Sequence, residues 1–170
     1  ALEEKAVYNQ LELDNGRMAK ISKDDVIIGA LGRRRALRGL VGDVPPQVRV
    51  GDTLHILNLG GVIGKCTSEN KDVGKPLAVE VMGMVVSGGR LLNISRDALA
   101  PRQVLGECPP LVLVAGTCMN AGKTAACCEI IQKFTSYGYA MAGVKLTGVA
   151  CLRDTLNMED HGARWTRSFL

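Results

Sequence analysis

The chain has 170 residues, of which 46% are hydrophobic and 22% are charged, and its formal net charge at pH 7 is +4. A chain of this length can bury a core without disulfide bonds, and it contains no apolar run near the roughly 20 residues that a membrane-spanning helix needs. The composition therefore excludes a disulfide-dependent miniprotein, a disordered chain and a membrane-spanning protein. We expect a globular protein of the cytoplasm.

The first hundred residues consist of short apolar runs separated by turn-forming residues. Apolar and polar residues alternate through residues 48–50 and again through residues 77–81, with Gly-Asp, Gly-Gly and Pro-Pro pairs between the runs. This pattern is typical of short strands at close spacing. It predicts a small all-β, barrel-like domain over residues 1–105, in which residues 1–13 fit a helix or a first strand equally well.

A different pattern begins after the proline-containing segment 97–110. An apolar run at residues 111–115 is typical of a buried strand, and a glycine-containing loop follows it. An amphipathic helix is expected at about residues 123–137, and a second buried strand at residues 139–146. This order predicts a βαβ unit, so we expect residues 106–170 to form an α/β domain in which helices flank a parallel sheet.

The loop at residues 116–124 carries the residue types that bind phosphate groups. Backbone N–H groups in such a loop, together with the positive end of the next helix, form a concave site for anions. We expect Gly122 to allow close approach of the backbone, Lys123 to neutralise the phosphates and Thr124 to hold Mg²⁺. The usual pattern has four residues between its glycines, whereas here five separate Gly116 from Gly122. The alternative is a helix start whose lysine points into solvent.

The run GTCMNAGKT at residues 116–124, followed by GYAMAGVKLTG at residues 138–148, resembles dethiobiotin synthetase and its relatives in the class of the MinD-type ATPases. The family's loop reads G-T-D-T-x-V-G-K-T, and its second strand carries a lysine. The resemblance covers roughly residues 111–162 and implies an α/β P-loop NTPase that binds ATP and Mg²⁺, with Asn120 and Ala121 also lining the phosphates. Cys118 and Met119 stand where the synthetase has Asp and Thr, so the resemblance supports the nucleotide half of its chemistry. The matching positions are Gly116, Thr117, Gly122, Lys123 and Thr124 in the loop and Lys145 in the second strand.

Three further residues are candidates for the same site. Lys145 ends the second predicted strand, where ligands bind in open parallel sheets, and would neutralise a γ-phosphate or an acyl phosphate; otherwise it is an exposed lysine at a strand end. The family resemblance implies a metal-binding aspartate in the stretch after this strand. We expect Asp160, or else Asp154, in that role. Asp154 would alternatively cap the start of a short helix.

The remaining chemistry-bearing residues fit structural roles. We interpret His55 as structural and His161 as a surface or capping residue. The arginine cluster could contact nucleic acid, but the chain is only 4% aromatic, so we favour a solvated basic loop. The cysteines contain no CxxC pair, and we interpret them as small reduced core residues rather than metal ligands. The arginine cluster consists of Arg33, Arg34, Arg35 and Arg38. The six cysteines are Cys66, Cys108, Cys118, Cys127, Cys128 and Cys151.

The chain offers few strands after residue 124 for a complete nucleotide-binding sheet, and its last residues, ARWTRSFL, have helical character without a capping glycine. We therefore expect a fragment of a longer protein. Such a fragment should bind phosphate weakly and should not hydrolyse ATP at a useful rate. Exposed apolar sheet edges predict self-association into a homo-oligomer.

Three functions are compatible with these residues. The first is an ATP- and Mg²⁺-binding NTPase whose second substrate is an unidentified small molecule. The second is an ATP-dependent, carboxylate-activating ligase similar to dethiobiotin synthetase. The third is a non-catalytic module that senses a nucleotide.

Overall fold

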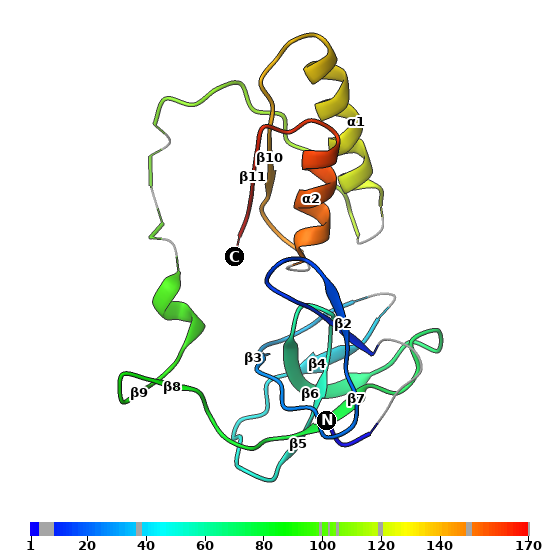
Figure 1. Cartoon of the computed structure of the whole chain (residues 1–170), viewed down its shortest axis with the longest axis vertical. Coiled ribbons are helices and arrows are strands. Elements are labelled where there is room, and N and C mark those ends of the chain that lie inside the picture. The colour runs from blue at the N-terminus through cyan, green and yellow to red at the C-terminus, as the bar shows by residue number, and fades with distance from the viewer. Residues whose placement is uncertain are drawn as a thin grey trace.

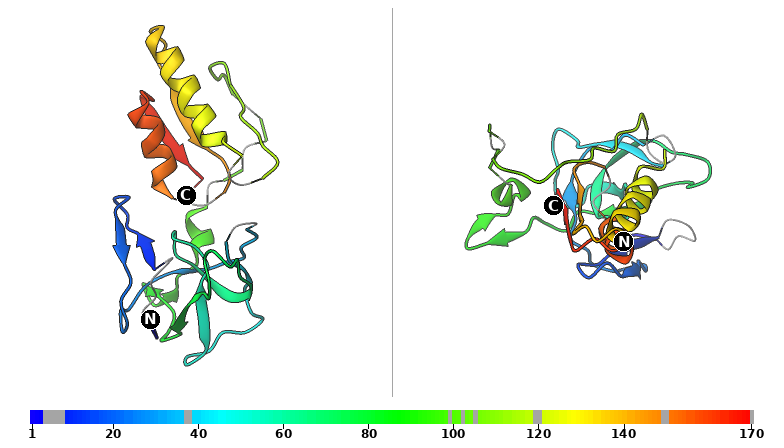
Figure 2. Two further views of the ribbon diagram at one scale, coloured as in Figure 1. Left: turned by 90° about the vertical axis from the view of Figure 1, so that its right-hand side faces the viewer. Right: turned by 90° about the horizontal axis from the view of Figure 1, so that it is seen from above.

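A computed structural model of the chain describes residues 1–3, 9–36, 39–98, 100–101, 103–104, 106–118, 121–148 and 151–169. Figure 1 shows two lobes, one rich in strands and formed by the N-terminal part of the chain, the other containing two helices and two strands near the C-terminus. A long extended segment connects them. The perpendicular views in Figure 2 show the same lobes stacked along the long axis of the molecule.

The β-rich lobe is built on a five-stranded sheet in the order β3-β6-β5-β7, with β4 also paired to β6. The pairings within it are antiparallel except for β3 with β6, and the sheet curves as half of a barrel. A separate antiparallel hairpin, β1–β2, lies beside it. The strands are β1 (Gln10–Glu12), β2 (Met18–Lys20), β3 (Ala30–Leu31), β4 (Val41–Asp43), β5 (Thr53–Ile56), β6 (Val62–Ser68) and β7 (Leu77–Glu80).

Alternating residues in two strands create the core of this lobe. Leu54 and Ile56 in β5, and Leu77 and Val79 in β7, are buried together with Ile21. Because side chains alternate along a strand, the residues between them lie on the outer face of the sheet. The strand predicted from alternation at residues 77–81 is confirmed, whereas residues 48–50 form no strand. Burial of apolar area on one face is what stabilises the sheet.

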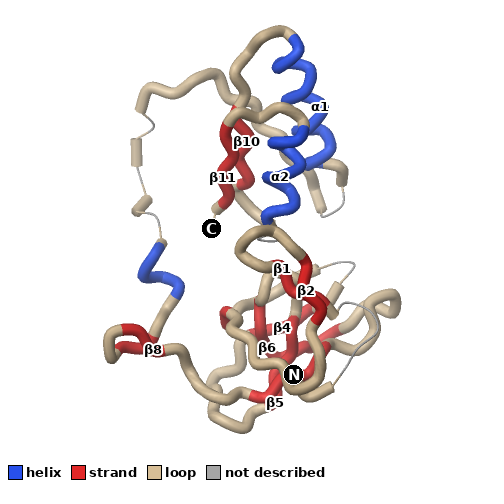
Figure 3. The backbone as a smooth tube through the Cα atoms, viewed as in Figure 1, coloured by secondary structure: helices blue, strands red, loops and turns tan. Residues whose placement is uncertain are grey.

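A long, exposed segment joins the lobes. It contains the two-stranded hairpin β8 (Val86–Ser87) and β9 (Arg90–Leu91) and a single 3-10 turn, η1 (Ile94–Asp97). The loop colour along the rest of this segment in Figure 3 shows how little regular structure it has. The strand predicted at residues 111–115 is absent from the structure. Its apolar side chains point to solvent, with Leu111 71%, Val112 63% and Leu113 79% exposed.

The second lobe packs two helices on one side of a parallel strand pair (Figures 1 and 2). Its core consists of Cys128, Ile131, Met158 and Ala163. Gly143 permits close packing of helix on strand, because a Cβ at this position would lie only 2.7 Å from the sulfur of Met158. The elements are α1 (Lys123–Ser136), β10 (Ala142–Lys145), α2 (Leu152–Asp160) and β11 (Trp165–Ser168).

The predicted α/β P-loop fold, a parallel sheet with flanking helices behind a barrel-like domain, is therefore wrong. The described strands are mostly short and are divided among several small sheets, and the only parallel pairs among them are β3 with β6 and β10 with β11. An apolar run such as residues 111–115 favours a strand but does not supply a partner for it, and here it remains unpaired. The predicted helix at residues 123–137 is confirmed as α1.

The C-terminal residues also differ from expectation. The helical character predicted for the last eight residues is wrong, because Trp165–Ser168 forms β11 in parallel register with β10. An aromatic residue followed by a β-branched one favours a strand when a partner is present. Neither α-helix of the described residues has the length and apolar character that crossing a membrane requires.

The two lobes touch where the β1–β2 hairpin meets α2. The carboxylate of Glu12 accepts hydrogen bonds from the backbone N–H groups of Leu152, at 2.8 Å, and of Arg153, at 3.3 Å. At the tip of the hairpin, Gly16 lies against the side chain of Leu156 so closely that a Cβ would come within 2.9 Å of it. We expected residues 1–13 to form either a helix or a first strand, and residues 10–12 of this segment form the strand β1.

Candidate functional site

The start of α1 is suited to an anion. Gly122 precedes the helix with φ +83°, in the left-handed region that glycine adopts without strain, and its carbonyl accepts the first helical hydrogen bond from Ala126. Among the described residues, no side chain caps the free N–H groups of the first turn, and that turn contains no acidic residue. These N–H groups and the positive end of the helix dipole therefore face the loop at residues 116–122.

The side chain of Lys123 turns back over this loop. Its ammonium group donates a hydrogen bond to the carbonyl oxygen of Cys118, at 2.6 Å. Gly116 lies against the aliphatic part of the same side chain, since a Cβ there would be 3.1 Å from Cγ and 3.2 Å from Cδ of Lys123. The side chain of Lys123 therefore lies along the described loop residues, and its ammonium contacts a loop carbonyl at the exposed surface of the lobe.

The predicted loop residues differ in exposure. Lys123 and Thr124 are half-buried in the first turn of α1, whereas the described loop residues around them are exposed. Asn120, which we expected to line the phosphates, lies outside the described residues, as does Met119. The exposed loop residues are Gly116, Thr117, Cys118, Ala121 and Gly122.

Lys145 and Asp154 form an ion pair with each other. Lys145 ends β10, and Asp154 lies in the first turn of α2, which begins at the same end of the lobe. Their side chains are only 14% and 21% exposed, so both charges are largely withdrawn from water. From the sequence we expected Lys145 to neutralise a phosphate and Asp154 to bind a metal. In the structure each already neutralises the other.

Asp160 lies at the opposite end of α2 from Asp154. Both helices begin at the end of their lobe that faces the β-rich lobe (Figures 1 and 2), so this end carries Lys123 and Asp154, while Asp160 is about 9 Å further along the helix axis. Next to Asp160, the ring of His161 makes a hydrogen bond through Nδ1 with the carbonyl of Asn157, at 2.7 Å. The predicted capping role of His161 is confirmed.

Three thiols of this lobe are shielded from water. Burial raises the pKa of Cys127, Cys128 and Cys151, and for Cys128 the neighbouring Cys127 raises it further. A raised pKa keeps these thiols protonated at neutral pH. In the part of the chain that the structure describes, no three residues among His, Cys, Asp and Glu group closely enough to hold a metal ion.

The arginine cluster is tied into the β-rich lobe. Arg33 and Arg35 lie beside Asp43, with the guanidinium of Arg35 donating to both oxygens of its carboxylate at 2.9 and 3.1 Å. Arg34 donates to the carbonyl oxygen of Leu57. The fourth arginine lies outside the described residues. The side chains of Arg33 and Arg35 remain 77% and 63% exposed, as expected of a solvated basic loop.

Sequence reasoning missed two features. The first is Glu12, which reaches the site from the β-rich lobe and contacts the start of α2. The second is a pocket in the β-rich lobe lined by His55, Cys66 and charged residues of two separate segments. No local pattern could reveal either one, because both depend on residues far apart in the sequence.

Comparison of this chain with models of protein families, with curated proteins and with solved structures found no match.

Proposed function

We propose that the loop at residues 116–124 binds the phosphates of ATP together with Mg²⁺. The observation that carries the proposal is the ammonium group of Lys123, which turns back over the loop and donates a hydrogen bond to the carbonyl oxygen of Cys118. A single neutral carbonyl is a weak partner for a full positive charge, and phosphate oxygens are a far stronger one. The N–H groups at the start of α1, which no described side chain caps, add donors of the kind that bind anions.

Each residue has a distinct task in this proposal. Lys123 neutralises the phosphates, and the left-handed Gly122 keeps a side chain away from them. Thr124 would hold Mg²⁺ through its hydroxyl, and the bound ion would neutralise further phosphate charge. Mg²⁺ usually retains several waters and takes one or two protein ligands beside the phosphates, so it does not require a cluster of carboxylates.

A second candidate is a module that binds the nucleotide without hydrolysing it. It is favoured by the ion pair between Lys145 and Asp154, because a lysine engaged with a carboxylate does not stabilise charge that develops during phosphoryl transfer. Under this alternative the pair is structural, and nucleotide binding alone is the function. Release of phosphate from ATP by the purified chain, lost in Lys123→Ala, would favour the NTPase instead; release only after a small carboxylic acid is added would favour the ligase.

The proposal is tested by measuring ATP affinity with and without Mg²⁺ by isothermal titration calorimetry. We expect Mg²⁺ to tighten binding and Lys123→Ala to weaken it about tenfold or more, since a charge-assisted contact is lost. Lys133→Ala is the matched control, because Lys133 lies in the last turn of the same helix with its ammonium 4.8 Å from the Tyr137 ring. Unchanged affinity in Lys123→Ala would overturn the proposal.

The setting of the protein is also part of the proposal. No disulfide joins the six cysteines, all of which lie in described parts of the chain, and this fits the reducing cytoplasm.

Val144 and Trp165, each 55% exposed on the side of the strand pair away from the helices, fit a homo-oligomer. Sedimentation of the purified chain at increasing concentration tests this expectation.

A further inference from the structure

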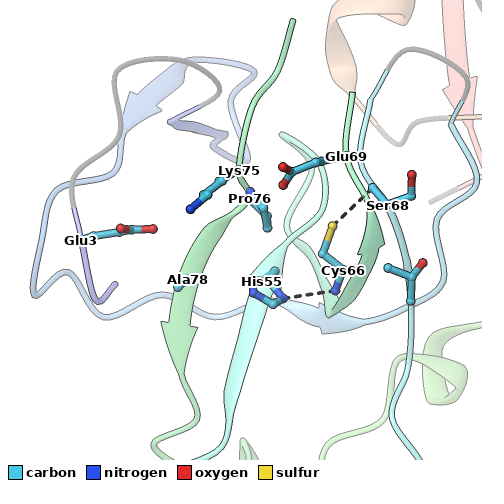
Figure 4. Close-up of a pocket in the computed structure, with 9 residues that line it drawn as sticks. Glu3, His55, Cys66, Ser68, Glu69, Lys75, Pro76 and Ala78 are labelled. Atoms are coloured by element: carbon cyan, nitrogen blue, oxygen red, sulfur yellow. Dashed lines mark hydrogen bonds between the residues drawn. The ribbon is translucent and has the colours of Figure 1, made fainter. Parts of the chain in front are cut away.

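A pocket of about 390 Å³ opens on the outer face of the β-rich sheet (Figure 4). Its floor consists of the side chains of Ala78, His55 and Cys66, which lie on three neighbouring strands. His55 of β5 pairs in register with Ala78 of β7 on one side and with Gly64 of β6 on the other, and Cys66 follows Gly64 on the same face. The floor therefore lies directly behind the buried face of the same strands.

Two hydrogen-bonded segments form the walls. The loop between β6 and β7 contributes Glu69 and Lys75, and the carbonyl of Asn70 within it accepts hydrogen bonds from two backbone N–H groups, at 3.0 and 2.9 Å. On the other side, the N-terminal segment carries Glu3. The backbone N–H of the preceding Leu2 donates to the carbonyl oxygen of Ala78, at 3.0 Å, which fixes this segment along β7.

The imidazole of His55 supplies a neutral hydrogen-bond donor. Its Nδ1 accepts a hydrogen bond from the backbone N–H of Cys66, at 3.1 Å, so the proton of the neutral ring is on Nε2. Burial lowers the pKa of His55, and the nearby Lys65 lowers it further, against weaker opposing effects of the Gly64 carbonyl and Glu3. The ring is therefore uncharged at neutral pH, and Nε2–H is held in a fixed direction at the pocket floor.

Charges of both signs surround this donor. Glu3, Glu69 and Lys75 all line the pocket, yet none of them forms an ion pair with another described residue. In Figure 4 the carboxylate of Glu3 and the ammonium of Lys75 extend from opposite walls, and Glu69 lies above the floor. The pocket thus offers one cation, two anions and a neutral donor within a volume typical of small-molecule sites.

We propose that this pocket binds a small zwitterion of the α-amino acid class. Lys75 and the Nε2–H of His55 would bind its carboxylate, and Glu3 and Glu69 would bind its ammonium group. A ligand with both charges can pair with Lys75 and with the two glutamates at once. A simple anion would be repelled by the two carboxylates, and a simple cation would be repelled by Lys75. This inference is independent of nucleotide binding, because it uses only residues of the β-rich lobe.

The test is a titration of the ¹⁵N-labelled chain with a mixture of the twenty common L-α-amino acids, followed by single amino acids, observed by ¹H–¹⁵N correlation spectra. We expect the amide signals of Cys66, Thr67 and Ala78 to shift with at least one amino acid, at a Kd of about 1 mM or tighter. The N-acetyl derivative and the methyl ester of that amino acid, each of which lacks one charge, should bind about tenfold more weakly.

Variants assign the contacts. Lys75→Met and Glu69→Gln should each weaken binding about tenfold, since each removes one charge-assisted contact at an exposed position that does not support the fold. Lys71→Met is the matched control, because Lys71 lies in the same loop but does not line the pocket. Absence of any shift near the pocket, equal binding of the N-acetyl derivative, or unchanged binding in Lys75→Met would overturn the proposal.

Discussion

The carboxylate of Glu12, in the β-rich lobe, accepts a 2.8 Å hydrogen bond from the backbone N–H of Leu152, the first residue of α2 in the other lobe. Its second oxygen accepts from Arg153, at 3.3 Å. Cys151 occupies the N-cap position of α2 but makes no capping hydrogen bond with its side chain. A residue 140 positions away in sequence thus does what an N-cap side chain does, and it fixes the start of α2 two residues before Asp154.

This contact should stabilise the protein measurably. We expect Glu12→Ala to lower the free energy of unfolding by about 0.5–2 kcal/mol, the effect of removing an N-cap side chain, because two N–H groups lose their acceptor. Urea denaturation followed by circular dichroism measures the change. Asp14→Ala, in the exposed turn of the same hairpin, is the control and should have little effect. Equal stability of wild type and Glu12→Ala would show that the cap contributes nothing.

The ion pair of Lys145 and Asp154 should behave as a partly buried pair. We expect Lys145→Met to destabilise the chain by about 1–3 kcal/mol, because it leaves the Asp154 carboxylate without its partner and with little access to water. Adding Asp154→Asn removes the orphaned charge, so the double variant should recover part of the lost stability. Thermal or urea unfolding of the two single variants and the double variant provides the measurement. If the losses simply add, the two residues do not interact.

His55 should make stability depend on pH. Its pKa in the folded chain is lowered from the ordinary value of 6.5, chiefly by burial, so the unfolded chain takes up a proton here at a higher pH than the folded chain does. The contribution of His55 to stability is therefore fully present above pH 6.5 and declines as the pH falls toward its folded pKa. In His55→Asn, whose side-chain oxygen can replace Nδ1 as the acceptor, this decline should be absent.

The measurement compares urea midpoints of wild type and His55→Asn between about pH 7.5 and about pH 5.5, a range that spans the ordinary histidine pKa. Other groups titrate in both proteins, so the difference between their two pH profiles isolates position 55. Parallel profiles would mean that the histidine titrates alike in folded and unfolded chains.

Local features were predictable from the sequence, and pairings between distant segments were not. The helical period at residues 123–136 and the alternation at residues 77–80 depend on near neighbours, and both elements are present. The apolar run at residues 111–115 has the composition of a buried strand, but a strand also needs a partner, which composition does not specify. The strand Trp165–Ser168 was not predicted, because its short sequence does not by itself indicate a strand. It forms a strand through its parallel pairing with β10.

In the candidate site, too, local features were predictable from the sequence and contacts between distant segments were not. The positions of Gly122 and Lys123 at the start of α1 were predictable, because they follow from a loop and the helix directly after it. The mutual pairing of Lys145 and Asp154 depends on how α2 is placed against β10, so sequence reasoning assigned the two residues to different ligands. Glu12 carried no signal, because an acidic residue in a short strand is ordinary until the fold brings a helix start to it.

Phosphate binding at residues 116–124 is tested most directly by the reactivity of Cys118. This exposed thiol belongs to the residue whose carbonyl oxygen accepts from the Lys123 ammonium, and the exposed Cys108 lies outside the loop as an internal control. The rates of iodoacetamide labelling at both cysteines are measured by mass spectrometry with and without ATP and Mg²⁺. Binding should slow labelling of Cys118 in proportion to the fraction bound, leave Cys108 unchanged, and give no protection in Lys123→Ala. Equal labelling of Cys118 with and without saturating ATP and Mg²⁺ would contradict nucleotide binding by this loop.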